Sequence, residues 1–125
     1  MKEATVKVKK NSGNRINNGV LEIKSNYQVI QIRTVDILFV KALSDYVIIE
    51  TTNGKFITLS TMKEMLKLLP ANLFIRVHRS YIVNLEKVLT HKGPSIYINK
   101  DKTKHTIPVG RSYIIDAKKK LDAFL

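Results

Sequence analysis

The sequence predicts one domain with a mainly β fold and two short helices. Its 125 residues are enough for a single hydrophobic core of ordinary size. From Val20 onward, short runs alternate between apolar and polar residues and are broken by turn-forming residues, a pattern typical of strands. Two other segments carry apolar residues at helical spacing. Hydrophobic residues make up 44% and charged residues 26% of the chain, which is typical of ordered globular domains.

The alternating runs predict strands at residues 20–24, 27–33, 37–42, 46–51, 55–59, 86–90, 95–99 and 105–109. Ser25 and Asn26 are expected to turn the chain between the first two runs. Between the fourth and fifth runs, Asn53 and Gly54 predict a tight hairpin, because both residue types tolerate the positive φ of a primed turn.

Capping signals and apolar spacing predict the two helices. Thr61 and Glu64 have the spacing of a capping box, and Pro70 ends the helix that follows. The apolar face of this helix is formed by Met62, Met65, Leu66 and Leu69. The second helix is expected to begin near Arg111 and Ser112. It is expected to turn Ile114, Ala117, Leu121 and Phe124 inward and Lys118, Lys119 and Lys120 outward.

The chain is expected to divide into a flexible basic arm or interdomain linker at residues 1–19 and a folded domain at residues 20–125. The arm is rich in turn-forming residues and has few large apolar groups to bury. Within it, residues 5–8 could pair as a short edge strand.

The charge balance points to an anionic partner. The chain has 22 Lys and Arg against 10 Asp and Glu, a formal net charge of +12. The surplus lies in the N-terminal arm and in the C-terminal half, with a neutral segment at residues 31–60. Such a surplus favours nucleic acid or an acidic membrane face, although a solvated basic surface would explain it equally well.

Neither an enzyme nor a cofactor or metal site is predicted. There is no Cys, the three His lie 13 and 14 residues apart, and the glycines stand singly at turns rather than in a phosphate loop. The acidic residues show no pairing that would tune a carboxyl group for catalysis. No apolar run approaches the ~20 residues of a membrane span, and no signal peptide is recognised, so a cytoplasmic location is expected.

The run FIRVHRSYIVN at residues 74–84 carries the functional interpretation. It sets the cationic and hydrogen-bonding cluster His78-Arg79-Ser80-Tyr81 between two apolar segments. Arginine offers a planar fork for guanine or phosphate, while histidine, serine and tyrosine can donate to backbone oxygens. The alternative is a buried polar turn, in which His78 and Ser80 bond loop carbonyls and Tyr81 packs in the core.

Five motifs occur in a fixed order: DILFV at 36–40, DYV at 45–47, LSTM at 59–62, the run at 74–84, and IPVGRSY at 107–113. In this order they resemble the LytTR family, the DNA-binding output domain of LytR/AlgR-type response regulators of bacteria. The resemblance covers about residues 20–125.

The resemblance implies small antiparallel sheets along the domain, with short helices beside them. Family members read two successive major grooves with loop side chains and usually bind paired direct repeats, so the implied partner is double-stranded promoter DNA, bound by a dimer. The implied base-reading residues are Asp45 and Tyr46 in one turn, Arg79, and Arg111. Beside these positions lie His78, Ser80 and Tyr113, with Lys102 and Lys104 as further candidates.

Regulators of this type carry an N-terminal receiver domain, whereas only about 19 residues precede the matched region here. The chain is therefore either a stand-alone regulator or the output half of a larger protein. One competing function is an RNA- or single-strand-binding β module that stacks bases on Tyr27, Tyr46, Tyr81, Tyr97 and Tyr113. Another is a protein-interaction or membrane-surface domain that uses the basic arm at residues 7–15.

Overall fold

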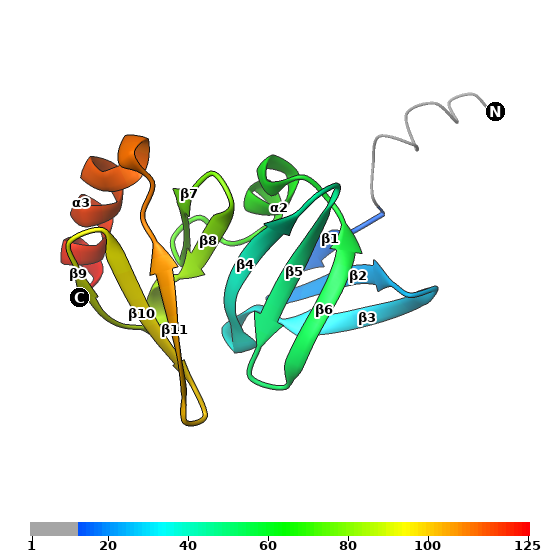
Figure 1. The fold of residues 1–125 in the computed structure, drawn as a ribbon. Helices are drawn as coiled ribbons and strands as arrows, with labels where there is room; N and C mark the ends of the chain where they lie inside the picture. Colours follow the sequence, from blue (N-terminus) through cyan, green and yellow to red (C-terminus); the bar gives the residue numbers. More distant parts are fainter. Residues whose placement is uncertain (1–12) are drawn as a thin grey trace.

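Three antiparallel sheets and two α-helices form the part of the chain that this computed structural model describes, residues 13–125 (Figure 1). The sheets follow one another along the domain, with a five-stranded sheet between two smaller ones. The mainly β fold with small sheets and two short helices, which the sequence predicted, is confirmed.

The first sheet consists of β1 (Arg15–Asn17), β2 (Val20–Ser25) and β3 (Gln28–Arg33), in that order. Alternation along β2 and β3 turns Leu21, Ile23 and Ile32 inward, where they are buried. A 3-10 turn, η1 (Thr34–Asp36), leads from this sheet into the next.

The central sheet has the strand order β6-β5-β4-β8-β7. Its strands are β4 (Ile37–Leu43), β5 (Tyr46–Thr51), β6 (Gly54–Leu59), β7 (Phe74–His78) and β8 (Tyr81–Asn84). Helix α2 (Met62–Leu68) lies between β6 and β7 and has the predicted capping box. In it, the Glu64 amide donates to the Thr61 hydroxyl at 3.0 Å, and the Thr61 amide donates to the Glu64 carboxylate at 2.9 Å.

The third sheet follows a second 3-10 turn, η2 (Leu85–Lys87), and has the order β11-β10-β9. Its strands are β9 (Val88–Lys92), β10 (Ser95–Lys100) and β11 (Thr103–Pro108). A third 3-10 turn, η3 (Arg111–Tyr113), then runs directly into α3 (Ile114–Phe124), which ends the chain.

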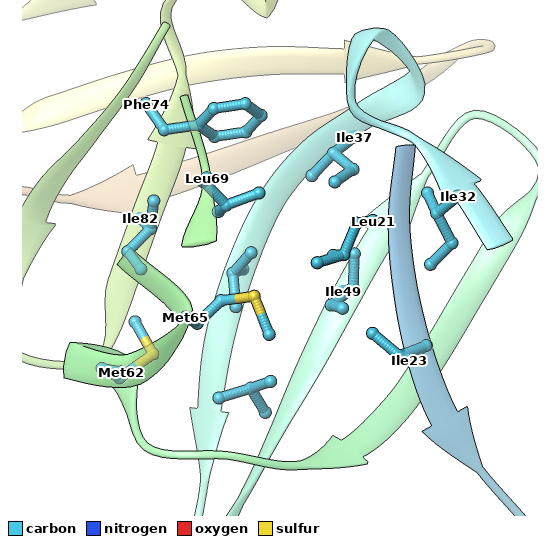
Figure 2. Close-up of a cluster of buried hydrophobic side chains, with 12 residues drawn as sticks. Leu21, Ile23, Ile32, Ile37, Ile49, Met62, Met65, Leu69, Phe74 and Ile82 are labelled. Atoms are coloured by element: carbon cyan, nitrogen blue, oxygen red, sulfur yellow. The ribbon is translucent and has the colours of Figure 1, made fainter. Parts of the chain in front are cut away.

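Strands β4, β7 and β8 of the central sheet are buried on both faces, because their successive residues enter two different cores. Val40 and Ile82 belong to a core shared with the first sheet and α2, shown in Figure 2. Their neighbours Phe39 and Val83 belong to a core shared with the third sheet and α3. The central sheet is therefore the layer on which the rest of the domain is assembled.

The first sheet begins earlier in the chain than the sequence predicted. Residues 13–18 were expected to lie in the arm, yet β1 pairs with β2, and Asn14 is buried. The Asn14 side chain accepts a hydrogen bond from the Lys24 amide and contacts Thr58 of β6, a residue distant in sequence. The expected strand at residues 5–8 and the rest of the arm at residues 1–12 lie outside the described residues.

Two predicted turns differ from the structure in detail. Tyr27 was expected in a strand but lies in the β2–β3 turn, where it and Asn26 have φ values of 63° and 51°. In the β5–β6 hairpin, which is present as predicted, Gly54 has a positive φ but Asn53 does not, so the expected primed turn there is wrong. The hydroxyl of Thr51 accepts a hydrogen bond from the Asn53 amide and stabilises a different turn.

Two further predictions are wrong near the third sheet. Glu86 and Lys87 were placed in a strand, but they belong to η2, because the Asn84 side chain caps that turn. On α3, Ala117 and Leu121 are buried as expected, whereas Ile114 and Phe124 remain 40% and 41% exposed. The three outward lysines of α3 are exposed as predicted.

The Tyr27→Gly variant is expected to be more stable than the parent domain by about 1 kcal/mol, since a left-handed residue with a Cβ is strained. The free energy of unfolding in urea measures this. Tyr27→Ala is the control, because it removes the exposed ring but keeps the Cβ. An equal gain for Ala and Gly would show that the backbone conformation is not the cause.

Candidate nucleic-acid interface

Three loops come together at one end of the domain, along the upper side of Figure 1. They are the β4–β5 turn at residues 44–45, the β7–β8 turn at residues 79–80, and the segment at residues 109–113 between β11 and α3. These loops hold the motif residues to which the sequence points. The structure therefore brings together positions that lie far apart in the chain.

Backbone hydrogen bonds join the β7–β8 turn to both neighbouring segments. The Ala42 amide of β4 donates to the Ser80 carbonyl at 2.9 Å. On the other side, the Gly110 amide donates to the Val77 carbonyl at 2.8 Å. The turn that carries Arg79 is thus held from both sides, and Arg79 itself is exposed.

His78 and Ser80 are half-buried at the base of the same turn. The Ser80 amide donates to His78 Nδ1 at 3.0 Å, so the Nε2 atom of the ring is left to donate to a ligand. The ring of Tyr81 lies between those of His78 and Phe39, with centroids 5.6 Å and 6.3 Å away. The half-buried Tyr81 ring thus supports the orientation of His78.

Arg111 follows a glycine that is packed closely against the same turn. A Cβ on Gly110 would lie 3.0 Å from the ring of Tyr113 and 3.4 Å from that of His78, so this close approach favours glycine. The Tyr113 amide donates to the Gly110 carbonyl at 2.8 Å and starts η3. Arg111 is exposed, and the hydrogen bond from Gly110 places it on the loop next to that of Arg79.

The β4–β5 turn is the third loop of this face. Ser44 has a positive φ of 53°, and the Ser60 amide donates to the Asp45 carbonyl at 3.3 Å, which ties the turn to the start of α2. Asp45 is exposed, and Tyr46 at the start of β5 is 47% exposed. A shallow groove lies between this turn, α2 and Arg76.

Lys102 and Lys104 are not brought to this face. They lie in and beside the β10–β11 turn, which is at the opposite, lower end of the domain in Figure 1. The Lys104 ammonium sits over the ring of Tyr97, 4.7 Å from its centroid. Both lysines are exposed.

Two negative findings apply to residues 13–125. No group of three or more His, Asp and Glu side chains there is arranged to hold a metal ion. No helix in this range has the length and apolar composition needed to cross a bilayer.

The family profile described as the LytTr DNA-binding domain matches residues 27–122 of the chain. The chain belongs to the LytTR family. The curated protein "Sensory transduction protein LytT" of Bacillus subtilis (strain 168) is 33% identical over an alignment of 105 residues that covers 81% of this chain and 43% of that protein. The chain thus spans less than half the length of this relative. A solved LytTr DNA-binding domain from Bacillus cereus has the same fold, with a TM-score of 0.70 and 22% identity over 84% of this chain and 98% of that one.

The family assignment confirms the resemblance inferred from the five motifs. LytTR is a family of DNA-binding domains rather than of enzymes, and this chain is one of its DNA-binding domains.

One residue of this LytTR domain was missed as part of the site. Arg76 of β7 donates from Nη2 to the Arg79 carbonyl at 2.6 Å and from Nε to the His78 carbonyl at 3.4 Å. Arg76 and His78 are two residues apart, so alternation along a strand predicts that they lie on the same side, and this was the available signal. The guanidinium lies over the turn because of how the β7–β8 hairpin closes, and the residues next to Arg76 in the sequence do not reveal this.

The last residue of the 74–84 motif has a structural role. Asn84 is fully buried, its amide donates to the Ile37 carbonyl at 2.9 Å, and its side-chain oxygen accepts from the Glu86 amide at 2.9 Å. It thereby joins β8 to the start of β4 and caps η2.

Asn84→Ala is expected to lower the free energy of unfolding by about 2–3 kcal/mol, because the buried Ile37 carbonyl and the Glu86 amide both lose their partner. Urea unfolding measures this loss. The slope of the free energy of unfolding against urea concentration should stay unchanged if the denatured state is unaffected. Asn99→Ala, at an exposed site on β10, is the matched control. A loss for Asn84→Ala no larger than that of the control would contradict this role.

Proposed function

We propose that this LytTR domain is a sequence-specific, double-stranded DNA-binding transcription regulator that reads major grooves with side chains from three loops. One observation supports this most directly. The 2.8 Å hydrogen bond from the Gly110 amide to the Val77 carbonyl puts the loops of Arg79 and Arg111 side by side, with both arginines exposed.

The chemistry of these loops suits a duplex. Each guanidinium can donate two parallel hydrogen bonds to O6 and N7 of a guanine, contacts that are worth about 1–3 kcal/mol of discrimination. His78, Ser80 and Tyr113 lie beside the arginines and can donate to phosphate oxygens. Asp45 and Tyr46 extend the face at its other end, where Asp45 can accept from a cytosine amine.

Lys102 and Lys104 play a different part in this proposal. Their hairpin lies at the other end of the domain from Arg79 and Arg111, so a single duplex on the three-loop face would not be in contact with both ends. We assign these lysines to the long-range attraction of DNA by the net charge of +12.

We further propose that the domain binds paired direct repeats in promoters as a dimer, in the cytoplasm. A receiver domain in a longer parent protein would control it, and the residues before Gly13 would then belong to the linker. The support is that the LytT relative is more than twice as long as the region it shares with this chain. Purification of the longer parent protein would test whether it contains a receiver domain and binds paired repeats as a dimer.

The alternative function, binding of single strands or RNA, needs a shared stacking platform, and the tyrosines do not form one. Tyr81 is packed between two rings, Tyr97 lies under Lys104, and Tyr113 contacts Gly110. Tyr27 is at the tip of a separate hairpin. Because these tyrosines lie on separate elements, they do not offer successive bases a common surface, and this favours duplex binding over single-strand binding.

Arg79→Ala and Arg111→Ala are each expected to weaken binding to the cognate duplex by about 1–3 kcal/mol, with much less effect on random DNA. The cognate site would come from selection of genomic fragments by the purified domain, and fluorescence anisotropy would give both dissociation constants. Arg33→Ala, at an exposed site on β3, is the control. Equal losses on both DNAs would show that the two arginines contact only the backbone.

Duplex DNA is expected to outcompete a single strand of the same sequence and RNA at fixed ionic strength. The logarithm of the duplex association constant should fall linearly with the logarithm of the salt concentration. The slope should be about −0.9 for each phosphate contacted. Competition titrations over a series of KCl concentrations measure both quantities. Preference for the single strand would favour the alternative, and a salt-insensitive complex would contradict the electrostatic part of the proposal.

A further inference from the structure

Arg76 reaches over the turn that presents Arg79. Its side chain is half-buried on β7, between the β4–β5 turn and the β7–β8 turn. Nη2 donates to the Arg79 carbonyl at 2.6 Å, and Nε donates to the His78 carbonyl at 3.4 Å. One guanidinium therefore binds two successive peptide groups of the turn.

The carbonyls on either side of these two accept from neighbouring backbone segments. The Val77 carbonyl accepts from Gly110, and the Ser80 carbonyl accepts from Ala42, so both ends of the turn are fixed from outside. The peptide groups between them project at the tip of the hairpin, where thermal motion is least restricted. The Arg76 side chain completes a series of four consecutive carbonyls that each have a donor.

We propose that Arg76 is a positioning residue, which fixes the backbone of Arg79 so that its side chain meets a base in one orientation. This inference rests on the proposed function, in which Arg79 reads DNA. A turn that is ordered before binding does not lose that conformational entropy on the DNA, so more of the contact energy appears as affinity and discrimination. Arg76 acts through Arg79 and needs no contact of its own with the DNA.

The planar shape of the guanidinium is the property on which this role depends. Two donors at a fixed angle span two peptide groups, whereas the ammonium of a lysine is a single point charge on a flexible stem. Arg76→Lys therefore keeps the charge that a phosphate contact would need but loses the fork. Arg76→Gln removes the charge and keeps one donor group.

The test is a double-mutant cycle on the 125-residue chain. Arg76→Lys, Arg79→Ala and the double variant are compared by the ratio of their dissociation constants for random and cognate duplexes. We expect Arg76→Lys to lower this ratio by about ten-fold when Arg79 is present and by less than about two-fold when it is absent. Arg33→Lys, on exposed β3, is the matched control and should leave the ratio unchanged.

A second measurement needs no DNA. The heteronuclear NOE of the Arg79 and Ser80 amides should fall in Arg76→Lys and in Arg76→Gln, while that of Ser44 in the β4–β5 turn stays unchanged. Circular dichroism and urea unfolding show whether each variant is folded. If Arg76→Lys does not fold, Arg76→Gln takes its place in the cycle.

The outcomes distinguish a positioning role for Arg76 from a direct contact with DNA. Additive effects of the two substitutions, or unchanged order in the turn, would overturn the positioning role. Equal losses on random and cognate DNA in Arg76→Gln, with a salt slope reduced by about one, would identify Arg76 as a phosphate contact instead. If Arg79→Ala alone leaves discrimination intact, the base-reading role of Arg79 fails, whereas the NOE result still decides whether Arg76 orders the turn.

Discussion

The candidate DNA-binding face depends on two backbone hydrogen bonds that hold the β7–β8 turn between its neighbours. The Ala42 amide binds the Ser80 carbonyl on one side, and the Gly110 amide binds the Val77 carbonyl on the other. Without them, the loops would be joined only through the strands and helices that carry them. With them, a single rigid edge is formed, on which the spacing between exposed side chains is set by peptide geometry rather than by flexible loops.

Burial of β4, β7 and β8 on both faces supports this edge from below. The first core packs β2, β3 and α2 against one face, and the second packs the third sheet and α3 against the other. Each of the two three-stranded sheets buries its hydrophobic face in a core that it shares with the five-stranded sheet. Asn84 adds a buried polar bond between β8 and β4, close to the junction of the layers.

Local patterns were sufficient to predict most elements but not the long-range geometry. The capping box at Thr61 is set by residues three apart, and it was predicted correctly. The positive φ of Tyr27 is imposed by the register of β2 against β3, and Asn14 is buried by contacts with Thr58, so neither could be read from neighbouring residues. The same holds for Arg76, whose position over the turn exists only once the hairpin has closed.

Net charge and loop geometry have different effects on the binding of DNA. A surplus of lysines and arginines attracts any polyanion, and its effect depends little on where each charge sits. Discrimination between sequences requires instead that a donor fork occupy one place and one orientation relative to the base edge. Under the proposed function, backbone contacts around Arg79 and the close packing of Gly110 before Arg111 would meet that requirement. A neighbour that never touches DNA can therefore change specificity as much as a residue that does, provided that it orders the backbone of the contacting one.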